Sequence, residues 1–291
     1  MDGIIIVDKP ASWTSHDVVA KLRGSLRTKR IGHGGTLDPM ATGVLPVFIG
    51  RATRAAEFCE NAEKEYIAGL RLGLVTDTQD VTGTMVSSID VSFSPADVSG
   101  VFRQFSGALK QIPPMYSAVK INGTKLYQMA RRGVDVPRPA RDIIVSEIEL
   151  LSGAENEFMF RVVCSKGTYI RTLCHDVGAA LGCGGAMSSL RRVRAGRFTI
   201  DMARPLDEIL EVSSSGLVDS IMIPIDKLFS QHPAFRLSDT ESRRHKNGAS
   251  CLLKGISDGS YRFYGPDGEF LSLGEVKSGE ARAIKSFFDP R

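Results

Sequence analysis

The sequence predicts an α+β fold in which helices flank a mixed, largely antiparallel sheet. Short apolar runs alternate with glycine and proline along most of the chain, and only a few segments repeat apolar residues at helical spacing. Two segments instead alternate apolar and polar residues, as strands with one buried face do. With 291 residues, 42% hydrophobic and 24% charged, the chain is long enough for one large domain and a small one.

The first predicted elements are a strand and a helix. The strand-like run Ile4–Val7 lies next to the N-terminus. A helix is predicted over residues 17–26, because its apolar residues fall on one face and the candidate caps Thr14 and Ser15 precede it. Two further helices are expected, an amphipathic one over residues 94–105 and a buried one over residues 169–181.

The two alternating segments predict neighbouring strands. Over residues 64–74, every second side chain from Tyr66 to Leu72 is apolar, and residues 157–163 repeat this pattern from Phe158 to Val162. Both are expected in an antiparallel sheet that is buried on one face.

Changes of composition divide the chain into parts. A basic, glycine-punctuated segment of low apolar content, over about residues 115–145, is predicted to be an insertion outside the core, mobile in the absence of a ligand. The large domain is expected to span residues 1–230. Residues 231–291 are expected to form a small β-rich module containing a hairpin over residues 261–271.

Positive charge is clustered although the net charge is only +4. One cluster contains Arg191, Arg192, Arg194 and Arg197, and the insertion contributes Lys120, Lys125, Arg131, Arg132, Arg138 and Arg141 against the single acid Asp135. A solvated helix face would usually interleave glutamates at i,i+4 spacing, which these clusters do not. They therefore favour binding of a polyanion such as a nucleic-acid backbone.

The cysteines and the N-terminus exclude other classes of protein. Five widely spaced cysteines form no CxxC pair and have no matching histidine spacing, so neither a disulfide framework nor a metal site is expected. The N-terminus carries no signal-peptide pattern and the chain has no apolar span of membrane length. We therefore expect a cytoplasmic protein without a membrane partner.

Asp38 lies in a glycine-dense loop, Gly32-His33-Gly34-Gly35-Thr36-Leu37-Asp38-Pro39. The three glycines permit positive φ and close approach of a ligand to the backbone, and Pro39 keeps Asp38 out of helical dihedrals. An aspartate in such a turn can simply accept hydrogen bonds from its own turn amides. It can equally be a catalytic carboxylate held on a loop.

Four blocks of sequence resemble, in order, the motifs of the TruB-type tRNA pseudouridine-55 synthases. The first joins Val7-Asp8-Lys9-Pro10 and Trp13-Thr14-Ser15-His16-Asp17 to the Asp38 loop, and the second runs from Lys64-Glu65-Tyr66 to Gly83. The third contains Pro113-Pro114, Tyr116-Ser117-Ala118 and Leu126-Tyr127, and the fourth contains Lys166-Gly167-Thr168-Tyr169-Ile170-Arg171 and Leu190-Arg191-Arg192. The chain departs from the family at Ala11-Ser12-Trp13, where a glycine is usual, and at Gln128, where an acid is frequent.

The resemblance implies the roles of individual residues in converting uridine to pseudouridine. Asp38 is similar to the catalytic acid, Arg171 to the arginine that pairs with it and keeps it ionised, and Tyr66 to the tyrosine on which the flipped base stacks. Without the resemblance, Arg171 would be a surface arginine, and Tyr66 and Leu190 ordinary core residues. The implied substrate-binding residues are Lys9, His33, Gly35, Arg131, Arg132, Lys166, Tyr169, Leu190 and Arg191.

The reaction breaks the bond between the ribose and a ring nitrogen of the uracil and joins the same ribose to carbon C5 of that uracil. There is no net redox change, so no cofactor or metal is expected. Whether Asp38 attacks covalently, or stabilises and deprotonates the sugar, is left open. His33 is the candidate to fill the place of the extruded uridine.

The resemblance also implies the partners. The RNA partner is the T-arm of tRNA, in which position 55 is modified. No obligatory protein partner is implied, so the protein is expected to be a monomer. Residues 232–291 resemble small PUA-like RNA-binding modules in a general way. An RNA-binding or RNA-folding protein on the same scaffold is the alternative, but it would not need Asp38, Tyr66 and Arg171. The guide-RNA-dependent branch of the superfamily is a third possibility, although the basic insertion resembles the bacterial stand-alone enzymes.

Overall fold

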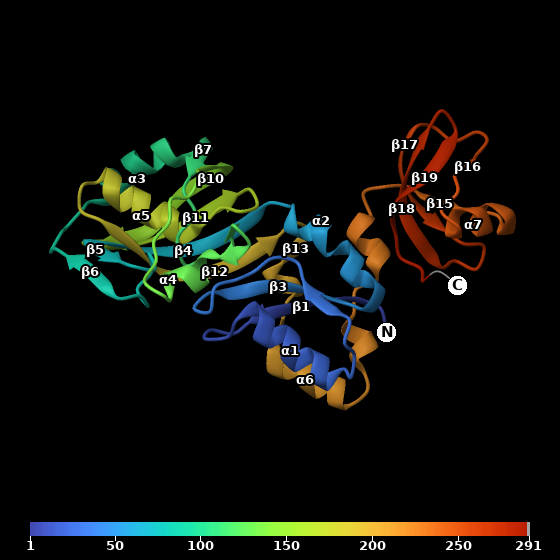
Figure 1. The fold of residues 1–291 in the computed structure, drawn as a ribbon, viewed down its shortest axis with the longest axis horizontal. Coiled ribbons are helices and arrows are strands. Elements are labelled where there is room, and N and C mark those ends of the chain that lie inside the picture. The colour runs from blue at the N-terminus through green and yellow to red at the C-terminus, as the bar shows by residue number, and fades with distance from the viewer. Residues whose placement is uncertain (290–291) are drawn as a thin grey trace.

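The computed structural model describes residues 1–289, which form an elongated body with a small module at one end (Figure 1). A ten-stranded sheet organises the larger part, in the order β14-β1-β3-β12-β4-β11-β10-β7, with β2 paired to β3 and β13 paired to β12. Its strands are β1 (Gly3–Lys9), β2 (Ile31–His33), β3 (Thr42–Ile49), β4 (Lys64–Leu72), β7 (Gly107–Gln111), β10 (Arg141–Ala154), β11 (Glu157–Cys164), β12 (Gly185–Ala195), β13 (Phe198–Thr199) and β14 (Arg204–Pro205).

The sheet is mixed and largely antiparallel, as predicted. Only the pairs β1–β14 and β3–β12 run parallel. The latter pair joins the two halves of the sheet, because β3 belongs to the N-terminal half and β12 is bonded on its other edge to β4. The Asp38 loop, between β2 and β3, is therefore brought beside strands that are far away in the sequence.

Helices cover the sheet in two groups (Figure 1). In the N-terminal half, α1 (Ser15–Ser25) and α6 (Leu206–Ser214) pack on β1 and β3 in one apolar core. In the other half, α3 (Pro95–Phe102) and α5 (Ile170–Ala180) share a core with β4, β10, β11 and β12. The short helical segments are η1 (Gly50–Ala55), α2 (Ala56–Glu60), η2 (Arg103–Phe105), η3 (Ile200–Met202), η4 (Val218–Ile221) and η5 (Ile225–Phe229).

The elements predicted from periodicity are confirmed. Thr14 caps α1 in a capping box with Asp17, and Ser94 caps α3 in the same way with Asp97. The apolar face from Tyr66 to Leu72 is buried, and β4 pairs antiparallel with β11. The helix expected over residues 94–105 ends at Phe102 and continues as the 3₁₀ turn η2.

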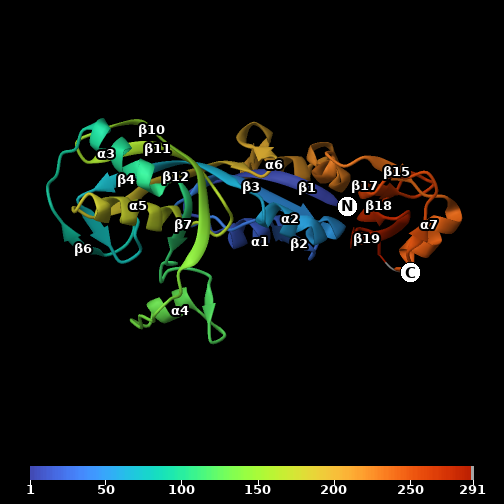
Figure 2. The same ribbon diagram turned by 90° about the horizontal axis from the view of Figure 1, so that it is seen from above.

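The insertion extends away from the body (Figure 2). It contains the two-stranded hairpin β8 (Lys120–Ile121) and β9 (Thr124–Lys125), followed by α4 (Leu126–Ala130). The chain rejoins the large sheet at Arg141, where β10 pairs with β7. Ile143 and Val145, which we had placed in the insertion, are core residues of the sheet. Another hairpin, β5 (Leu74–Thr76) and β6 (Met85–Ser88), follows β4.

The C-terminal module is β-rich and contains the predicted hairpin, β17–β18. Its five-stranded sheet has the order β15-β17-β18-β19-β16, and residues 290–291 lie outside the described part of the chain. Phe270 and Phe287 pack against Phe229 of the larger part, so the two parts share an apolar contact. The module's elements are β15 (Ala234–Arg236), α7 (Asp239–Lys246), β16 (Cys251–Leu252), β17 (Gly259–Tyr264), β18 (Phe270–Lys277) and β19 (Glu280–Ser286).

The cysteines and the lengths of the helices were the subject of two expectations from the sequence. All five cysteines lie within the described residues, buried and with free thiols. Across residues 1–289, no helix combines the length and the apolar character needed to cross a membrane.

Candidate active site

The loop that carries Asp38 is held by the first residue of α1 and by the segment before it. The hydroxyl of Ser15 accepts a hydrogen bond from the amide of Leu37 at 2.8 Å, and the amide of Ser12 donates to the carbonyl of Pro39 at 2.9 Å. Ser15 is buried, so its bond is shielded from water. The two residues flanking Asp38 are thus both fixed, which limits the motion of the carboxylate between them.

Lys9 also fixes this loop. Its ammonium donates to the carbonyls of Pro10 at 2.8 Å and Pro39 at 3.2 Å, and to that of Trp13. The residue is fully buried, and burial lowers the pKa of Lys9 to about 8 although Asp38 and Asp17 act in the opposite direction. We had grouped Lys9 with the substrate-binding residues. Because its charge is enclosed by backbone carbonyls, it supports the loop from inside the protein instead.

The glycines of the loop have different functions. Gly35 alone among Gly32, Gly34 and Gly35 has a positive φ, of 126°, which corrects the expectation that all three provide that freedom. Its carbonyl accepts from the buried guanidinium of Arg192 at 3.0 Å. Gly34 is needed for space, since a Cβ there would lie 2.8 Å from the ring of Phe48.

Gly43 is the second residue of β3, directly after the loop, and its replacement tests this packing. Its φ is +99° and a Cβ would lie 2.2 Å from the carbonyl oxygen of Arg192. We expect Gly43→Ala to lower the free energy of unfolding by about 2–4 kcal/mol, because backbone strain and a collision with backbone act together. Gly107→Ala is the matched control, since Gly107 has φ +92° but, within the described residues, no atom within 4 Å of the added Cβ. Urea unfolding of both variants checks this, and equal losses would show that strain alone matters.

Asp38 and Arg171 form a two-pronged ion pair. The guanidinium Nε lies 2.8 Å from Asp38 Oδ2, and Nη2 lies 3.2 Å from Oδ1. The Arg171 side chain is 5% exposed, whereas that of Asp38 is 33% exposed, so the arginine is behind the carboxylate and the carboxylate faces solvent. This geometry orients the carboxylate toward an incoming ligand.

Arg171 is the second residue of α5, at a helix end that favours anions over cations. Its charge is compensated there by Asp38 and by the buried Asp80, whose Oδ2 lies 3.8 Å from Nε. Asp80 Oδ1 accepts from the hydroxyl and amide of Thr82 and from the hydroxyl of Thr78 at 2.9 Å. Asp80 was absent from our predicted site. Its sequence signal was the Thr76, Thr78, Asp80 and Gly83 pattern in the second block, which by itself is typical of a turn.

Tyr66 and Leu190 belong to the apolar core that also contains Leu37, the residue before Asp38. Both are 8% exposed, and β4 and β12 place them on adjacent strands. Burial raises the pKa of Tyr66, against the opposing charge of Arg192, so its hydroxyl is protonated at neutral pH. This apolar core thus extends to the residue before Asp38, and an apolar surface near a carboxylate suits a flat, uncharged ring.

His33, the candidate to replace an extruded base, ends β2 and is half-buried. Burial lowers the pKa of His33, assisted by the charge of Arg192, so the ring is neutral at pH 7. Its Nδ1 is buried and, among residues 1–289, has no hydrogen-bond partner. An unpartnered nitrogen on a neutral ring is compatible with a ligand contact.

The arginine cluster on β12 and in the turn after it is largely engaged within the protein, which corrects our view of it as a patch that binds a nucleic-acid backbone. Arg192 is 1% exposed and Arg194 pairs with Glu65 at 3.0 Å. Arg197 bonds the carbonyl of Lys227 and the hydroxyl of Ser230. Arg191, a predicted substrate-binding residue, is 42% exposed and paired with Asp8 at 2.8 Å. Strand alternation from Leu190 could have identified Arg192 as inward-facing.

The remaining predicted substrate-binding residues lie on two separate surfaces. Lys166 is exposed and donates to Asn61 at 2.8 Å, and the backbone of Tyr169 is bonded at both N and O by the buried side chain of Gln111. Arg131 and Arg132 are exposed on the insertion, with Arg131 over the ring of Tyr127. The insertion is therefore the basic cluster that remains open to solvent.

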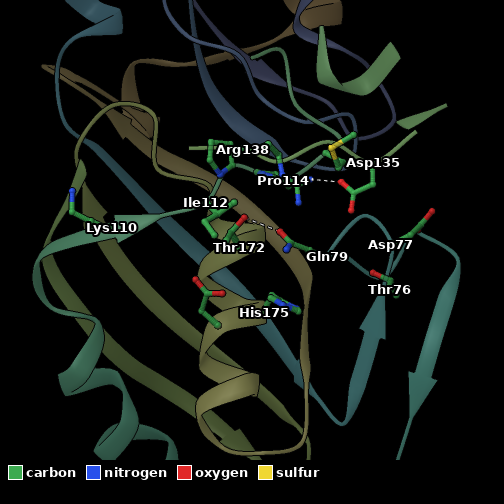
Figure 3. Close-up of a pocket in the computed structure, with 13 residues that line it drawn as sticks. Thr76, Asp77, Gln79, Lys110, Ile112, Pro114, Asp135, Arg138, Thr172 and His175 are labelled. Atoms are coloured by element: carbon green, nitrogen blue, oxygen red, sulfur yellow. Dashed lines mark hydrogen bonds and ion pairs between the residues drawn. The ribbon is translucent and has the colours of Figure 1, made fainter. Parts of the chain in front are cut away.

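A polar pocket of about 450 Å³ lies between α5 and the two ends of the insertion. Figure 3 shows Thr172 bonded to Gln79 on one side and Arg138 paired with Asp135 on the other. Arg171 is not part of its lining, so this pocket is adjacent to the Asp38 site and separate from it.

Comparisons with known proteins identify the family of this chain. The family model described as "TruB family pseudouridylate synthase (N terminal domain)" matches residues 23–170, and "tRNA pseudouridylate synthase B C-terminal domain" matches residues 171–230. A protein of Geobacillus thermodenitrificans (strain NG80-2) named tRNA pseudouridine synthase B is 41% identical over 284 residues, which cover 94% of each chain. One of the same name from Clostridium kluyveri is 40% identical over 293 residues, covering 99% of this chain and 100% of that one.

Solved structures share the fold over nearly the whole chain. A Cbf5–Nop10–Gar1 complex matches with a TM-score of 0.74 and 28% identity, over 99% of this chain and 85% of the matched chain. A structure of an H/ACA RNP bound to a substrate RNA containing 2'-deoxyuridine matches with a TM-score of 0.73 and 27% identity, over 99% of this chain and 86% of the matched chain. The long mixed sheet is that of a pseudouridine synthase. Within that class, the chain belongs to the TruB family of pseudouridylate synthases.

Proposed function

We propose that this protein isomerises one uridine in the T-loop of tRNA, position 55, to pseudouridine. The observation that supports this most directly is the Asp38–Arg171 pair, whose carboxylate is one-third exposed and follows Leu37 of the core that contains Tyr66 and Leu190. The name tRNA pseudouridine synthase B, carried by relatives about 40% identical over nearly the full length, specifies the RNA.

The catalytic steps follow from the placement of these groups. The target uridine leaves its stack, and the uracil enters against Tyr66 and Leu190. Asp38, oriented by both prongs of Arg171, then acts on the ribose or base as the glycosidic bond breaks. After the uracil has turned, C5 bonds to the ribose and loses its proton, and the nitrogen released from the ribose gains one. Atoms and electrons balance within the nucleotide, so the proposal includes no cofactor.

We assign the remaining predicted residues by their exposure. His33 fills the place of the extruded uridine, beside Gly35, whose backbone the ligand can approach closely. Arg191, Lys166 and Tyr169 line the approach to the site, and Arg131 and Arg132 contact phosphates of the T-arm. Lys9 contributes indirectly, through the loop that it holds.

The protein is proposed to act alone as a cytoplasmic monomer. The relatives named tRNA pseudouridine synthase B match at 40–41% identity over 94–100% of their length, whereas the Cbf5 complexes match at 27–28% identity. We assign residues 1–230 to the catalytic domain and residues 231–291 to a PUA-like RNA-binding domain. That module is held on the catalytic domain by the Phe229 contacts and by an ion pair of Arg51 with Glu269.

Incubation with an unmodified tRNA transcript tests the function. Chemical mapping of pseudouridine should find one modified residue, in the T-loop. Modification of a different RNA only, or binding of tRNA without any pseudouridine, would refute the assignment. The second result would favour the RNA-folding alternative.

The insertion is expected to supply phosphate contacts. Reversing Arg131 and Arg132 to Glu should weaken tRNA binding and lower the slope of log affinity against log salt by about two, since each lost phosphate contact removes about one. Arg103→Glu is the control, because Arg103 is exposed in η2 directly after α3, and α3 lies on the opposite side of the body from α4 (Figure 2). Titrations at several salt concentrations measure the slope, and circular dichroism checks the fold. An unchanged slope and affinity would mean that these arginines are only solvated.

A further inference from the structure

Arg171 donates two hydrogen bonds to backbone carbonyls that belong to two different segments of the chain. Nη1 donates to the carbonyl of Thr78 and Nη2 donates to that of Tyr116, each at 2.9 Å. Thr78 belongs to the turn between β5 and β6, whereas Tyr116 lies where the insertion leaves the body. The orientation of the catalytic arginine is therefore set in part by the base of the insertion.

The side chain of Tyr116 ties these two backbone segments together. Its hydroxyl donates to Asp77 Oδ2 at 3.2 Å, and Asp77 is the residue before Thr78. Partial burial and the Asp77 carboxylate raise the pKa of Tyr116, so its hydroxyl remains a donor at neutral pH. Asp77 is itself held, because its Oδ1 accepts from the amide of Thr84 at 2.7 Å. One side-chain bond thus closes a ring that contains both carbonyls bound by Arg171.

The base of the insertion is connected directly to its basic tip. The amide of Tyr127 donates to the carbonyl of Ser117 at 3.1 Å, and that of Leu126 donates to Val119 at 2.8 Å. Leu126 is fully buried, which anchors the start of α4. Arg131 follows α4 at once. A displacement of the basic tip therefore reaches Tyr116 through a short, hydrogen-bonded path.

We propose that Tyr116 is a positioning residue that couples the seating of the insertion on RNA to the geometry of the Asp38–Arg171 pair. When the insertion is bound to RNA, the Tyr116–Asp77 bond holds the carbonyls of Thr78 and Tyr116 against the guanidinium. The two N–H groups of Arg171 that face Asp38 then keep its carboxylate oriented. Without that bond the Tyr116 carbonyl is free to move away from Nη2, and the carboxylate loses its fixed direction. This inference rests on the proposed function, because it concerns the same reaction.

Tyr116→Phe tests the coupling, since it removes the hydroxyl and keeps the ring. Single-turnover pseudouridine formation at saturating tRNA should fall on the order of tenfold, as expected when a reacting group is misplaced by a fraction of an ångström. The Kd for tRNA should stay within about twofold, because no phosphate contact is lost. Tyr264→Phe is the matched control, as it removes a tyrosine–aspartate bond of 2.8 Å, to Asp226, far from Asp38.

A double-mutant cycle with Asp77→Ala separates coupling from general damage. If the two side chains act through their shared bond, adding Tyr116→Phe to Asp77→Ala should lower the rate no further. The proposal would be overturned if the rate losses of the two single variants multiplied in the double variant. An unchanged rate in Tyr116→Phe, or a rate loss matched by an equal loss of affinity, would also overturn it. An inactive wild-type protein in the same assay would instead refute the proposed function, so the two failures are distinguishable.

Discussion

Asp38→Asn is expected to abolish pseudouridine formation while tRNA affinity changes little. The amide has no negative charge to act on the ribose or base, and it offers one acceptor oxygen where Arg171 now meets two. The phosphate contacts proposed for the insertion do not involve Asp38, so binding should persist. Single-turnover assays at saturating tRNA, with filter binding on the same samples, measure both quantities.

Residual turnover above about a thousandth of wild type would count against Asp38 as the essential acid, given the usual scale of such deletions. Asp142→Asn provides the matched control. Asp142 pairs with Lys110 at 2.9 Å, but its side chain is 88% exposed on β10, so losing this charge should leave the rate unchanged.

Arg171→Lys is expected to reduce the rate on the order of a hundredfold, because an ammonium cannot reproduce the planar fork that meets both carboxylate oxygens. It also cannot reach Asp38, Thr78 and Tyr116 at once, as the guanidinium does. The substitution keeps the positive charge, so the loss would report geometry. Rate measurements should show a fall in kcat with a smaller change in KM.

Arg161→Lys is the corresponding control. Arg161 also bridges two carboxylates, those of Glu65 and Glu147, each at 2.6 Å, but it lies on the face of β11 away from Tyr66. Its replacement should leave the reaction intact. Near-normal activity of Arg171→Lys would remove Arg171 from the site, and equal losses in both variants would point to general destabilisation.

Local patterns predicted much of the fold. Alternation from Tyr66 to Leu72 and from Phe158 to Val162 identified β4 and β11, because each strand has one buried face. Ser94 marked the start of α3 through its capping box. The parallel pairing of β3 with β12 could not be predicted, since it joins residues nearly 150 positions apart, such as Arg192 and Gly43, and no local signal encodes it.

The candidate site was predictable only in part. The residue types of the motifs pointed to Asp38, Tyr66 and Arg171, and the structure brings Arg171 into contact with Asp38. Composition could not tell which basic residues face RNA and which face the protein. Lys9 and Arg192 appear as charges in the sequence, yet both are buried against backbone carbonyls. Their role depends on loops that meet only in the folded chain.

The most direct test of the account compares wild type and Asp38→Asn on one unmodified tRNA transcript, in buffer without added cofactor. Wild type is expected to convert the T-loop uridine to about one pseudouridine per tRNA, and Asp38→Asn is expected to bind the transcript but leave that uridine unchanged. Conversion by Asp38→Asn at a rate near wild type, or none by wild type, would contradict it.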